Sequence, residues 1–322
     1  MRTFAAALLS AATARVMTET DFEFINFVAQ HNKNYGTVEE FNMRAAVFAE
    51  THAEIAALNN SETSVHGHNK FSDFTREEYR KMLGLKNIEM PAANGCLSGT
   101  PTVDSVNWIQ AGKVDAVQDQ GQCGSCWAFS TALSTSSAYA IDVEDVVYSL
   151  SQQQLVDCAH GLNQGCNGGM YTYAWNYLKS NSFMLKADYP YTAVDGTCMY
   201  DESKGVMHAG GNDARHPYES ICADSNSIKS AIQTKPNSVA IKADSMVFQT
   251  YKSGVITSEK CGTEIDHAVT AVGFGTEDGQ DYYLVQNSWA ETWGDNGTVK
   301  IAATEGAGTC GINQNVAYPY VY

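Results

Sequence analysis

One stretch, residues 120–130, constrains this sequence more than any other. It reads Gln-Gly-Gln-Cys-Gly-Ser-Cys-Trp-Ala-Phe-Ser, and its glycines loosen the backbone before Cys126. The residues after Cys126 run to about Ala140 with Phe129 and Leu133 on one face, which predicts a helix. Cys126 therefore lies at or near a helix N-terminus, where free N–H groups and the helix dipole favour an anion. A thiol in such a place becomes the nucleophilic thiolate more easily.

Cys123 and Cys126 have the C-x-x-C spacing that also occurs in zinc half-sites and redox pairs. A structural zinc site needs a second pair of Cys or His residues at short spacing, and the sequence contains none. A redox pair would leave Gln120 and the later His and Asn residues described below without a role. A single nucleophilic cysteine is therefore the favoured interpretation.

The composition is that of a globular protein with an acidic balance. The chain has 322 residues, of which 44% are hydrophobic, so it can form one large or two modest domains. Up to Gly95 it carries 9 Lys and Arg against 12 Asp and Glu, and from Cys96 onward 11 against 24. The formal charge of −16 argues against nucleic acid as a partner. No apolar run after the first residues is as long as a membrane span, so we expect a soluble product.

The first 14 residues are typical of a secretory signal. Arg2 precedes an apolar run, and Ala12-Thr13-Ala14 offers a cleavage site of the A-x-A type. The alternative is an alanine-rich helix start. Nine cysteines agree with a secretory route, because one reactive thiol leaves eight cysteines for four bridges. Spacing alone cannot choose among the 105 pairings that eight cysteines allow.

Residues 15–94 lack the Gly-rich and Tyr-rich texture that begins after Cys123. Residues 39–60 predict a long amphipathic helix, because several residues fall on related faces with three- and four-residue spacings. These residues are Glu40, Arg44, Val47, Phe48, Ile55 and Asn59. Residues 90–95 are small and polar and include a proline, which suits a junction that proteases can reach.

The rest of the chain changes in character along its length. Residues 150–158 contain a Ser N-cap and predict a helix, and residues 171–179 predict another. Four later segments, separated by Gly, Asp and Asn, predict strands. They are residues 238–243, 268–274, 282–286 and 298–301. A mostly helical half followed by a mostly β half predicts an α+β fold of two subdomains with a cleft between them.

The segment around Cys126 resembles the active-site segment of the papain family of cysteine peptidases, whose local signature is Cys-Gly-[Ser/Ala]-Cys-[Trp/Tyr]. The residues of the predicted helix 39–60 resemble the ERFNIN pattern of cathepsin L-like propeptides, with Thr51 in place of the family's first Asn. Residues 67–73, Gly-His-Asn-Lys-Phe-Ser-Asp, match that family's G-x-N-x-F-x-D segment. The two propeptide motifs stand in the family's order before the nucleophile.

This resemblance implies a division of the chain. Residues 1–14 would be a signal peptide, 15–94 an inhibitory propeptide and 95–322 the mature peptidase. The mature part would have the papain-like two-subdomain fold, with a helical left domain over about 111–213 and a β-barrel-like right domain over about 214–322. The helical prodomain would lie across the cleft. In acid, the ion pairs of the prodomain would weaken because their carboxylates lose their charge. The carboxylates concerned are those of Glu40, Asp73, Glu77 and Glu78.

The resemblance also implies the catalytic residues. Cys126 would be the nucleophile, and His267, which follows it by 141 residues at the entry to a predicted strand, would be the base. Asn287 would orient the imidazole and fix its tautomer without adding a charge. Gln120 would donate to the oxyanion of the tetrahedral intermediate. The chemistry is acyl transfer, which requires no metal and no organic cofactor.

Substrate-binding positions follow from the same resemblance. Gly168 and Gly169 would pair with the substrate main chain, whereas the glycines by themselves would indicate a plain turn. Trp289 would cover the catalytic imidazole and exclude water from it. Ala290 stands where the family has Gly, and it adds strain if this position needs φ > 0. The pocket for the second residue before the scissile bond would be lined by Met170, Ala240, Ile265, Ala268 and Asn315. Most of this set is apolar, which favours Leu, Val or an aromatic residue in the pocket.

Three disulfides of the family correspond to pairs in this sequence, namely Cys123–Cys166, Cys158–Cys198 and Cys261–Cys310. Cys96 and Cys222 remain. Cys96 lies 30 residues before Cys126, much like the N-terminal cysteine of mite group-one allergen proteases, which implies a Cys96–Cys222 bond and maturation upstream of it. The alternative is that Cys96 leaves with the propeptide and Cys222 stays unpaired.

The predicted function is that of a cysteine endopeptidase made as a zymogen in the secretory pathway, for a lysosome, a digestive vacuole or secretion. Its partners would be protein and peptide substrates, its own propeptide and cystatin-type inhibitors, and it would act as a monomer. An exopeptidase is one alternative, but it needs a segment that blocks one end of the cleft, and no long insertion between Gly121 and Gly168 supplies it. A binding or storage protein on this scaffold is the other. Such a protein would usually lack the nucleophile.

Overall fold

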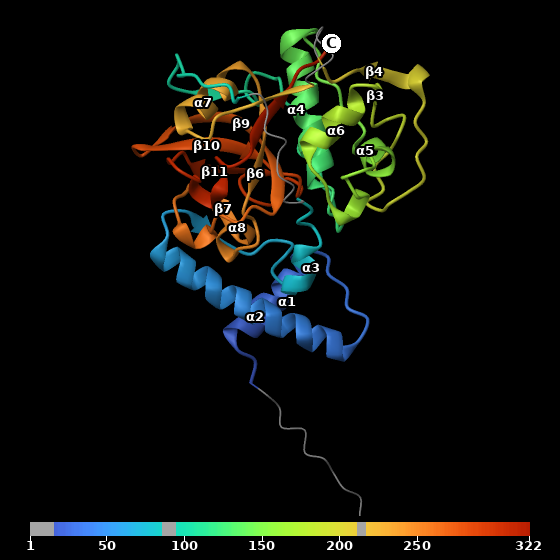
Figure 1. Ribbon diagram of the computed structural model, residues 1–322. Helices are drawn as coiled ribbons and strands as arrows, with labels where there is room; N and C mark the ends of the chain where they lie inside the picture. The colour runs from blue at the N-terminus through green and yellow to red at the C-terminus, as the bar shows by residue number, and fades with distance from the viewer. Residues whose placement is uncertain (1–15, 86–94, 211–216) are drawn as a thin grey trace, which may run out of the picture.

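The computed structural model describes residues 16–85, 95–210 and 217–322. The predicted signal peptide, residues 1–14, and most of the predicted junction, residues 90–94, lie outside the described residues. Within the described ranges the chain forms a helical N-terminal region, the predicted prodomain, and, above it, two halves of unlike structure (Figure 1). None of the described helices is long and apolar enough to cross a membrane.

The helices of the prodomain begin at threonine residues. The hydroxyls of Thr37 and Thr75 accept hydrogen bonds from the backbone N–H groups of Glu40 and Glu78, and these bonds satisfy donors that a helix start leaves free. Phenylalanine side chains of the first two helices form a small buried cluster of their own. The elements are α1 Glu19–Gln30, α2 Val38–Ser61, β1 Val65–His66 and α3 Arg76–Arg80.

Ion pairs connect the elements of the prodomain. Lys33 Nζ lies 2.6 Å from a carboxylate oxygen of the buried Asp73, and the guanidinium of Arg44 bonds both carboxylate oxygens of Glu78 at 2.5 and 2.7 Å. The Arg44 hydrogen bonds lower the pKa of Glu78 to about 2. Glu77 was expected to contribute as well, but among the described residues it forms no ion pair, and its side chain is exposed. Of the other predicted carboxylates, Asp73 and Glu78 form these close pairs, and Glu40 lies 3.7 Å from Arg44.

One long buried helix, α4 (Cys126–Asp142), is the centre of the helical half. Hydroxyls in this helix bond carbonyls one turn earlier, as Thr131 does to Trp127, so polar side chains can lie inside the molecule. Ser130 Oγ lies 2.8 Å from the carbonyl oxygen of Val269, which joins the helix to the sheet of the other half. The further elements of this half are α5 Gln152–Cys158, α6 Tyr171–Leu178, β3 Phe183–Met184 and β4 Gly205–Met207.

A sheet of eight strands forms the other half. Its order is β5-β12-β6-β9-β10-β11-β8, with β2 pairing β9 outside this path, and only β11 and β8 pair in parallel. The strands are β2 Val106–Asn107, β5 Tyr218–Ser220, β6 Asn237–Ile241, β8 Val255–Ile256, β9 His267–Glu277, β10 Gln280–Gln286, β11 Thr298–Ala302 and β12 Val316–Pro319. Beside the sheet lie β7 (Tyr251–Ser253) and the helices α7 (Ser225–Thr234) and α8 (Met246–Gln249).

The observed elements confirm the predicted α+β fold and correct the bounds of its parts. The helix predicted over residues 39–60 is α2, and the strand predicted over 268–274 is the middle of β9, which extends to Glu277. The strands β5, β7, β8 and β12 were not predicted. Each has only two to four residues, so their sequences contain too little alternation to be read as strands.

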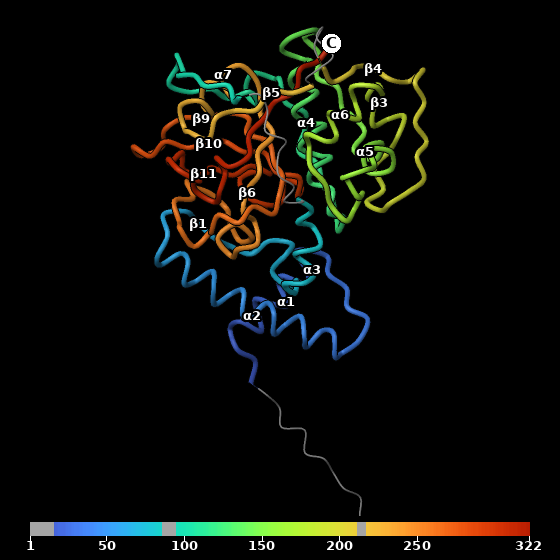
Figure 2. The backbone as a smooth tube through the Cα atoms, viewed as in Figure 1, coloured from blue at the N-terminus to red at the C-terminus, as the bar shows by residue number. Residues whose placement is uncertain are grey.

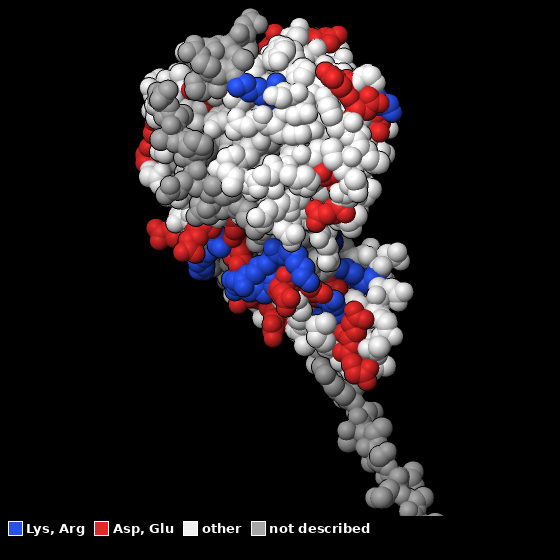
Figure 3. Space-filling view, turned by 45° about the vertical axis from the view of Figure 1, so that its right-hand side comes forward, with Lys and Arg blue, Asp and Glu red and all other residues white. Residues whose placement is uncertain are grey.

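The prodomain covers the same end of both halves (Figure 2). Its strand β1 pairs antiparallel with β7 of the sheet half, and its residues Phe71, Tyr79 and Met82 belong to the same buried cluster as the sheet side chains. Charged side chains of both signs gather on the prodomain in Figure 3, whereas the face of the two halves seen there is largely uncharged. The prodomain thus combines a charged outer surface with an apolar surface buried against the rest of the chain.

Candidate active site

The sulfur of Cys126 lies where the two halves meet. Cys126 is the first residue of α4, and its side chain is fully buried. It is the one free cysteine among the described residues. The backbone N–H of Ala268, the second residue of β9, lies 3.5 Å from Cys126 Sγ. The helix start therefore presents the thiol directly to the N-terminal end of β9, a central strand of the sheet.

His267 and Asn287 meet at the ends of two neighbouring strands. His267 is the first residue of β9, and Asn287 follows the last residue of β10. His267 Nε2 lies 2.9 Å from Asn287 Oδ1, and because an amide oxygen only accepts, Nε2 carries the proton. The neutral ring then has a bare Nδ1, which is buried and has no hydrogen-bond partner among the described residues. This nitrogen is available to accept a proton from a thiol.

Gln120 is fully buried between the two halves and the prodomain. Its side-chain oxygen accepts hydrogen bonds from Ser288 Oγ at 2.6 Å and Trp289 Nε1 at 3.1 Å. These bonds fix the direction of the amide group, so that Nε2 points away from the sheet. Nε2 donates to the carbonyl oxygens of Cys123 and Met82, each 2.8 Å away. One of these oxygens belongs to the prodomain.

Trp289 lies against the imidazole of His267. The two ring centroids are 4.7 Å apart, and the indole is fully buried. Prodomain rings pack edge-on against the indole, with centroid distances of 5.2 Å to Phe71 and 5.5 Å to Tyr79. The next residue, Ala290, has φ 62°, so this position does require the left-handed conformation that costs Ala more than Gly.

Residues 82–85 of the prodomain, which we call the strap, run through the cleft. The Gly169 N–H donates to Gly84 O at 2.8 Å, and the Leu85 N–H donates to Asp266 O at 3.1 Å. Leu85 and Gly169 pair in parallel. Gly84 has no room for a side chain, because a Cβ there would lie 1.8 Å from the carbonyl oxygen of Gly124. The strap therefore bonds the Gly169 backbone and the Gln120 side chain at the same time.

Burial under the strap changes the titration of the two reactive groups. Burial raises the pKa of the Cys126 thiol to about 11, although backbone N–H groups of Ala268, Gly84 and Trp127 act in the opposite direction. Burial also lowers the pKa of His267 to about 4, against the hydrogen bond to Asn287. In the covered state both groups are neutral. At the thiol, desolvation thus opposes the stabilisation of a thiolate that the helix N-terminus provides.

The predicted pocket residues lie together on both sides of the cleft. Met170, Ala240 and Ala268 belong to one buried cluster, and Leu85 of the strap belongs to it too, with Ile265 packed against its edge. Asn315 is buried, and its side-chain oxygen accepts a hydrogen bond from the Tyr171 hydroxyl. Leu85 of the strap thus lies in the same buried cluster as three of the side chains that the sequence assigned to the substrate pocket.

All eight remaining cysteines form disulfides. The pairs are Cys96–Cys222, Cys123–Cys166, Cys158–Cys198 and Cys261–Cys310. The Cys123–Cys166 bond joins the segment before Cys126 to the segment that contains Gly168 and Gly169. Because Cys123 is bonded to Cys166, the C-x-x-C pair is unavailable for metal or redox chemistry. The Cys96–Cys222 bond fixes the first described residues after the prodomain to the sheet half.

Sequence reasoning missed the residues of the strap and one neighbour of Gln120. The sequence of residues 82–85 contains no motif that indicates a functional site. Its one distinctive residue is Gly84, the only glycine between Gly67 and Gly95. Ser288 was not singled out from the sequence, yet its hydroxyl donates a hydrogen bond to the side-chain oxygen of Gln120. Both omissions concern contacts between segments far apart in the sequence.

Comparisons with known proteins agree with this geometry. The family model described as papain family cysteine protease matches residues 102–320, and that of the cathepsin propeptide inhibitor domain matches residues 24–79. The chain is 38% identical to a probable cysteine protease, RD21B, of Arabidopsis thaliana, over 97% of this chain and 69% of that protein. It is 36% identical to germination-specific cysteine protease 1 of the same plant, over 93% and 84% of the two chains. The structure superposes on digestive procathepsin L2 proteinase from Tenebrio molitor larval midgut with a TM-score of 0.85 and 30% identity, over 93% and 99% of the two chains.

A buried cysteine at a helix start, an imidazole on the facing sheet and an inhibitory domain across the cleft define a cysteine peptidase held in zymogen form. The chain belongs to the papain family of cysteine proteases. Its N-terminal domain is an inhibitor of the type found in cathepsin propeptides, so the propeptide is the enzyme's own inhibitor and peptides are its substrates.

Proposed function

We propose that the mature enzyme is an endopeptidase in which Cys126 is the nucleophile, His267 the proton carrier, Asn287 the positioning residue and Gln120 the oxyanion donor. The observation that carries this proposal is the position of Met82 O. It lies 2.8 Å from Gln120 Nε2 and belongs to a strap that also places a backbone N–H near Cys126 Sγ. This contact supports the proposal that Gln120 Nε2 donates to the oxygen of a scissile carbonyl, because it already donates to a carbonyl oxygen of the protein's own chain.

The reaction follows from these positions. Removal of the strap admits water to the cleft, so the burial that keeps both groups neutral is lost and the proton can pass from Cys126 Sγ to His267 Nδ1. The thiolate attacks the carbonyl carbon, and the oxyanion accepts hydrogen bonds from Gln120 Nε2 and the backbone at the start of α4. The imidazolium protonates the leaving amine. Neutral His267 then takes a proton from water, which hydrolyses the thioester.

The buried cluster around Leu85 supports a preference for an apolar residue at the second position before the scissile bond. Leu85 shares its buried cluster with Met170, Ala240 and Ala268, and none of these side chains carries a charge. Burial of a leucine-sized side chain contributes roughly 1.5–3 kcal/mol. We therefore propose Leu, Val and aromatic residues at this position, because a charged residue would enter the pocket without a partner.

The strap also favours an endopeptidase over an exopeptidase. It enters the cleft from α3 on one side and passes Gly169 and Asp266 with its main chain bonded to both, so the cleft accepts a continuous chain. Residues 121–168 contain α4, α5 and their connections. We propose further that the propeptide is removed in acid near Gly95, and that the mature enzyme starts upstream of Cys96. We also propose that it works as a monomer in an acidic vacuole, in a lysosome or outside the cell, with cystatin-type inhibitors as partners.

Acid activation followed by a peptide panel tests this function. After activation, N-terminal sequencing should place the cut near Gly95, and fluorogenic peptides with Leu, Val or Phe at the second position should be cleaved at least about 10-fold faster than those with Asp or Lys. The Cys126→Ala variant should show no activity, and an epoxide inhibitor should label Cys126 in the parent. Absence of labelling would favour a binding or storage protein. Cleavage only of dipeptide units from chain ends would favour an exopeptidase.

A further inference from the structure

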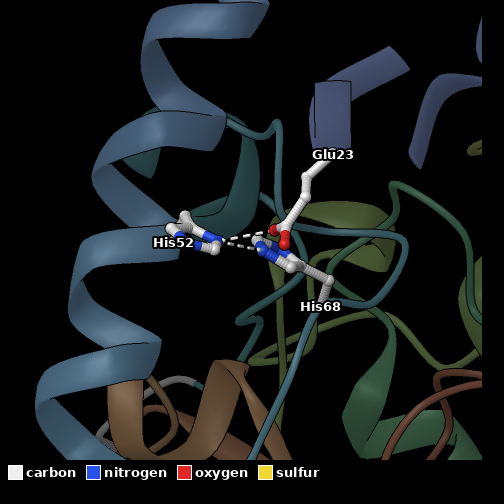
Figure 4. Close-up of side chains that lie close together, drawn as sticks. All are labelled: Glu23, His52 and His68. Atoms are coloured by element: carbon white, nitrogen blue, oxygen red, sulfur yellow. Dashed lines mark hydrogen bonds and ion pairs between the residues drawn. The ribbon is translucent and has the colours of Figure 1, made fainter. Parts of the chain in front are cut away.

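Outside the cleft, three side chains with metal-binding atoms converge within the prodomain. Glu23 comes from α1, His52 from α2 and His68 from the segment between β1 and α3 (Figure 4). One ligand atom from each lies within 4.8 Å of the others. The active-site chemistry uses none of the three.

The distances within this group are those of a coordination site. His52 Nδ1 lies 3.0 Å from Glu23 Oε2 and 3.1 Å from His68 Nε2. Ligand atoms that share a tetrahedral Zn²⁺ at 2.0–2.1 Å stand about 3.3 Å apart. Two of the three separations therefore need to change by only a few tenths of an ångström to admit the ion.

Hydrogen bonds between Glu23, His52 and His68 explain the close approach of the three side chains less completely than a bound metal ion does. A carboxylate oxygen and two ring nitrogens face one another, and all three can donate an electron pair. A single proton on His52 Nδ1 would have to be shared between Glu23 and His68. A proton on His68 Nε2 instead would leave His52 Nδ1 and Glu23 Oε2 as two acceptors 3.0 Å apart. A cation between the three atoms satisfies all of them.

Packing fixes the direction of His68 before any ion binds. Its ring stacks on Phe48 with centroids 4.1 Å apart and 13° between the planes, and Phe27 lies at 6.4 Å. The next residue, Asn69, is buried and donates to Gln249 O at 2.7 Å. The ring therefore cannot turn away without loss of this packing, and a preorganised ligand binds metal more tightly.

We propose that Glu23, His52 and His68 form a Zn²⁺ site that cross-links α1, α2 and the segment after β1 and stabilises the prodomain. Two imidazoles and one carboxylate are a known ligand set for zinc, whereas Mg²⁺ and Ca²⁺ prefer oxygen ligands alone. The side chains of His52 and Glu23 are 35% and 40% exposed, so water can reach the fourth coordination position and the ion can enter. The Lys252 side chain packs beside Gly67, the residue before His68, and its positive charge opposes the ion, so the affinity should rise when this charge is removed.

Zinc titration of the full-length Cys126→Ala chain tests the site, because this variant can neither cleave itself nor bind zinc through the active-site thiol. Calorimetry should find one Zn²⁺ bound per chain, and the melting temperature should rise with zinc but not with Mg²⁺ or Ca²⁺. His52→Gln, His68→Gln and Glu23→Gln, each in this background, should weaken binding by roughly 100-fold or more. His160→Gln, at an exposed histidine outside the prodomain, is the matched control and should bind like the parent.

The outcomes separate the site from ordinary packing. Equal zinc binding by the parent and the three variants would overturn the proposal, and so would no binding by the folded parent. Should the variants fold poorly, Co²⁺ added to the parent provides a second measurement. Visible absorption of a tetrahedral histidine-ligated ion, abolished by equimolar Zn²⁺, supports the site, and an unchanged aqueous Co²⁺ spectrum contradicts it. Tighter zinc binding by Lys252→Met would support the placement of the ion beside His68.

Discussion

The prodomain and the mature part are stabilised by different means. All nine cysteines lie at or after position 96, and eight of them form disulfides around the sheet and the helical half. The prodomain has no cysteine. It is held by ion pairs, by one small aromatic cluster and by apolar residues that pack into the core of the sheet half. One region is cross-linked permanently, and the other depends on charges that acid can remove.

This difference explains how a single chain can be inactive before cleavage and still give a stable enzyme after it. The contacts that block the cleft, such as Met82 O on Gln120 and Gly84 against Gly124, all come from the region without cross-links. The groups that they cover belong to the region with four disulfides. A change of pH can then loosen the inhibitor and leave the enzyme intact.

The largest expected effect concerns Gln120, which contacts both regions. In Gln120→Ala the mature enzyme loses an oxyanion donor, so we expect kcat to fall roughly 10²–10³-fold with little change in KM. Steady-state kinetics on one fluorogenic peptide measure this effect. Gln122→Ala, two residues away at an exposed position, should keep the parent's kcat. If kcat fell equally in both variants, the cause would be a disturbance of this segment of the chain and not the loss of a hydrogen bond to the oxyanion.

The next largest effect is expected from loss of the Cys96–Cys222 bond, which joins residues 126 positions apart in the sequence. The double variant Cys96→Ser/Cys222→Ser should lower the unfolding free energy of the mature enzyme by about 2–4 kcal/mol, because its unfolded chain is less restricted. Urea unfolding of both mature enzymes gives this value. The activity of the uncleaved chain should stay the same, and a rise would show that latency also depends on the cross-link.

Gly84→Ala should weaken inhibition without altering the mature enzyme. A methyl group at this position would lie 1.8 Å from Gly124 O, so the strap must move, at a cost of about 1–3 kcal/mol. We expect the uncleaved chain to be roughly 5- to 140-fold more active at pH 7, as measured in initial rates with a gel to show that the chain is intact. In Gly36→Ala the nearest atom to the new Cβ is 3.7 Å away, and this control should remain inactive.

The smallest effect is a pH-dependent one at Glu78. Its pKa is lowered to about 2 in the folded prodomain, so its charge adds stability at neutral pH, and this contribution is lost as pH falls from about 4.5 to about 2. Glu78→Gln should therefore destabilise the prodomain by about 1–2 kcal/mol at pH 7, and the difference from the parent should shrink steadily over that range.

Trp289 fluorescence in urea reports this transition, because Phe71 and Tyr79 of the prodomain lie against the indole. The exposed Glu77 provides the matched control, and Glu77→Gln should behave like the parent at every pH. A difference between Glu78→Gln and the parent that persisted at pH 2 would contradict the assignment to charge.

Local patterns predicted the parts of the fold that have a clear period or cap. The amphipathic face of α2, the Ser151 cap of α5 and the apolar β9 were all evident from the sequence, and the structure contains each of them. The structure also brings Cys126, His267, Asn287 and Gln120 together, although only motif spacing and resemblance indicated that four distant segments would meet. No periodicity encodes such a meeting.

The strap and the state of the thiol could not be predicted in the same way. Residues 82–85 act through main-chain oxygens and N–H groups, which every residue has, so their side chains give no signal. The helix N-terminus suggested an easily ionised Cys126, but the thiol is buried by a segment 41 positions earlier in the chain, and this burial determines its pKa. Contacts between distant segments decide both features.

The absence of cysteine from the prodomain has one more consequence. Before cleavage the inhibitor is tethered, so its effective concentration at the cleft does not depend on how much protein is present. After a single cut between the two regions, nothing covalent holds them together, and inhibition becomes a bimolecular equilibrium. The same cleaved protein would then be inhibited at high protein concentration and become active on dilution.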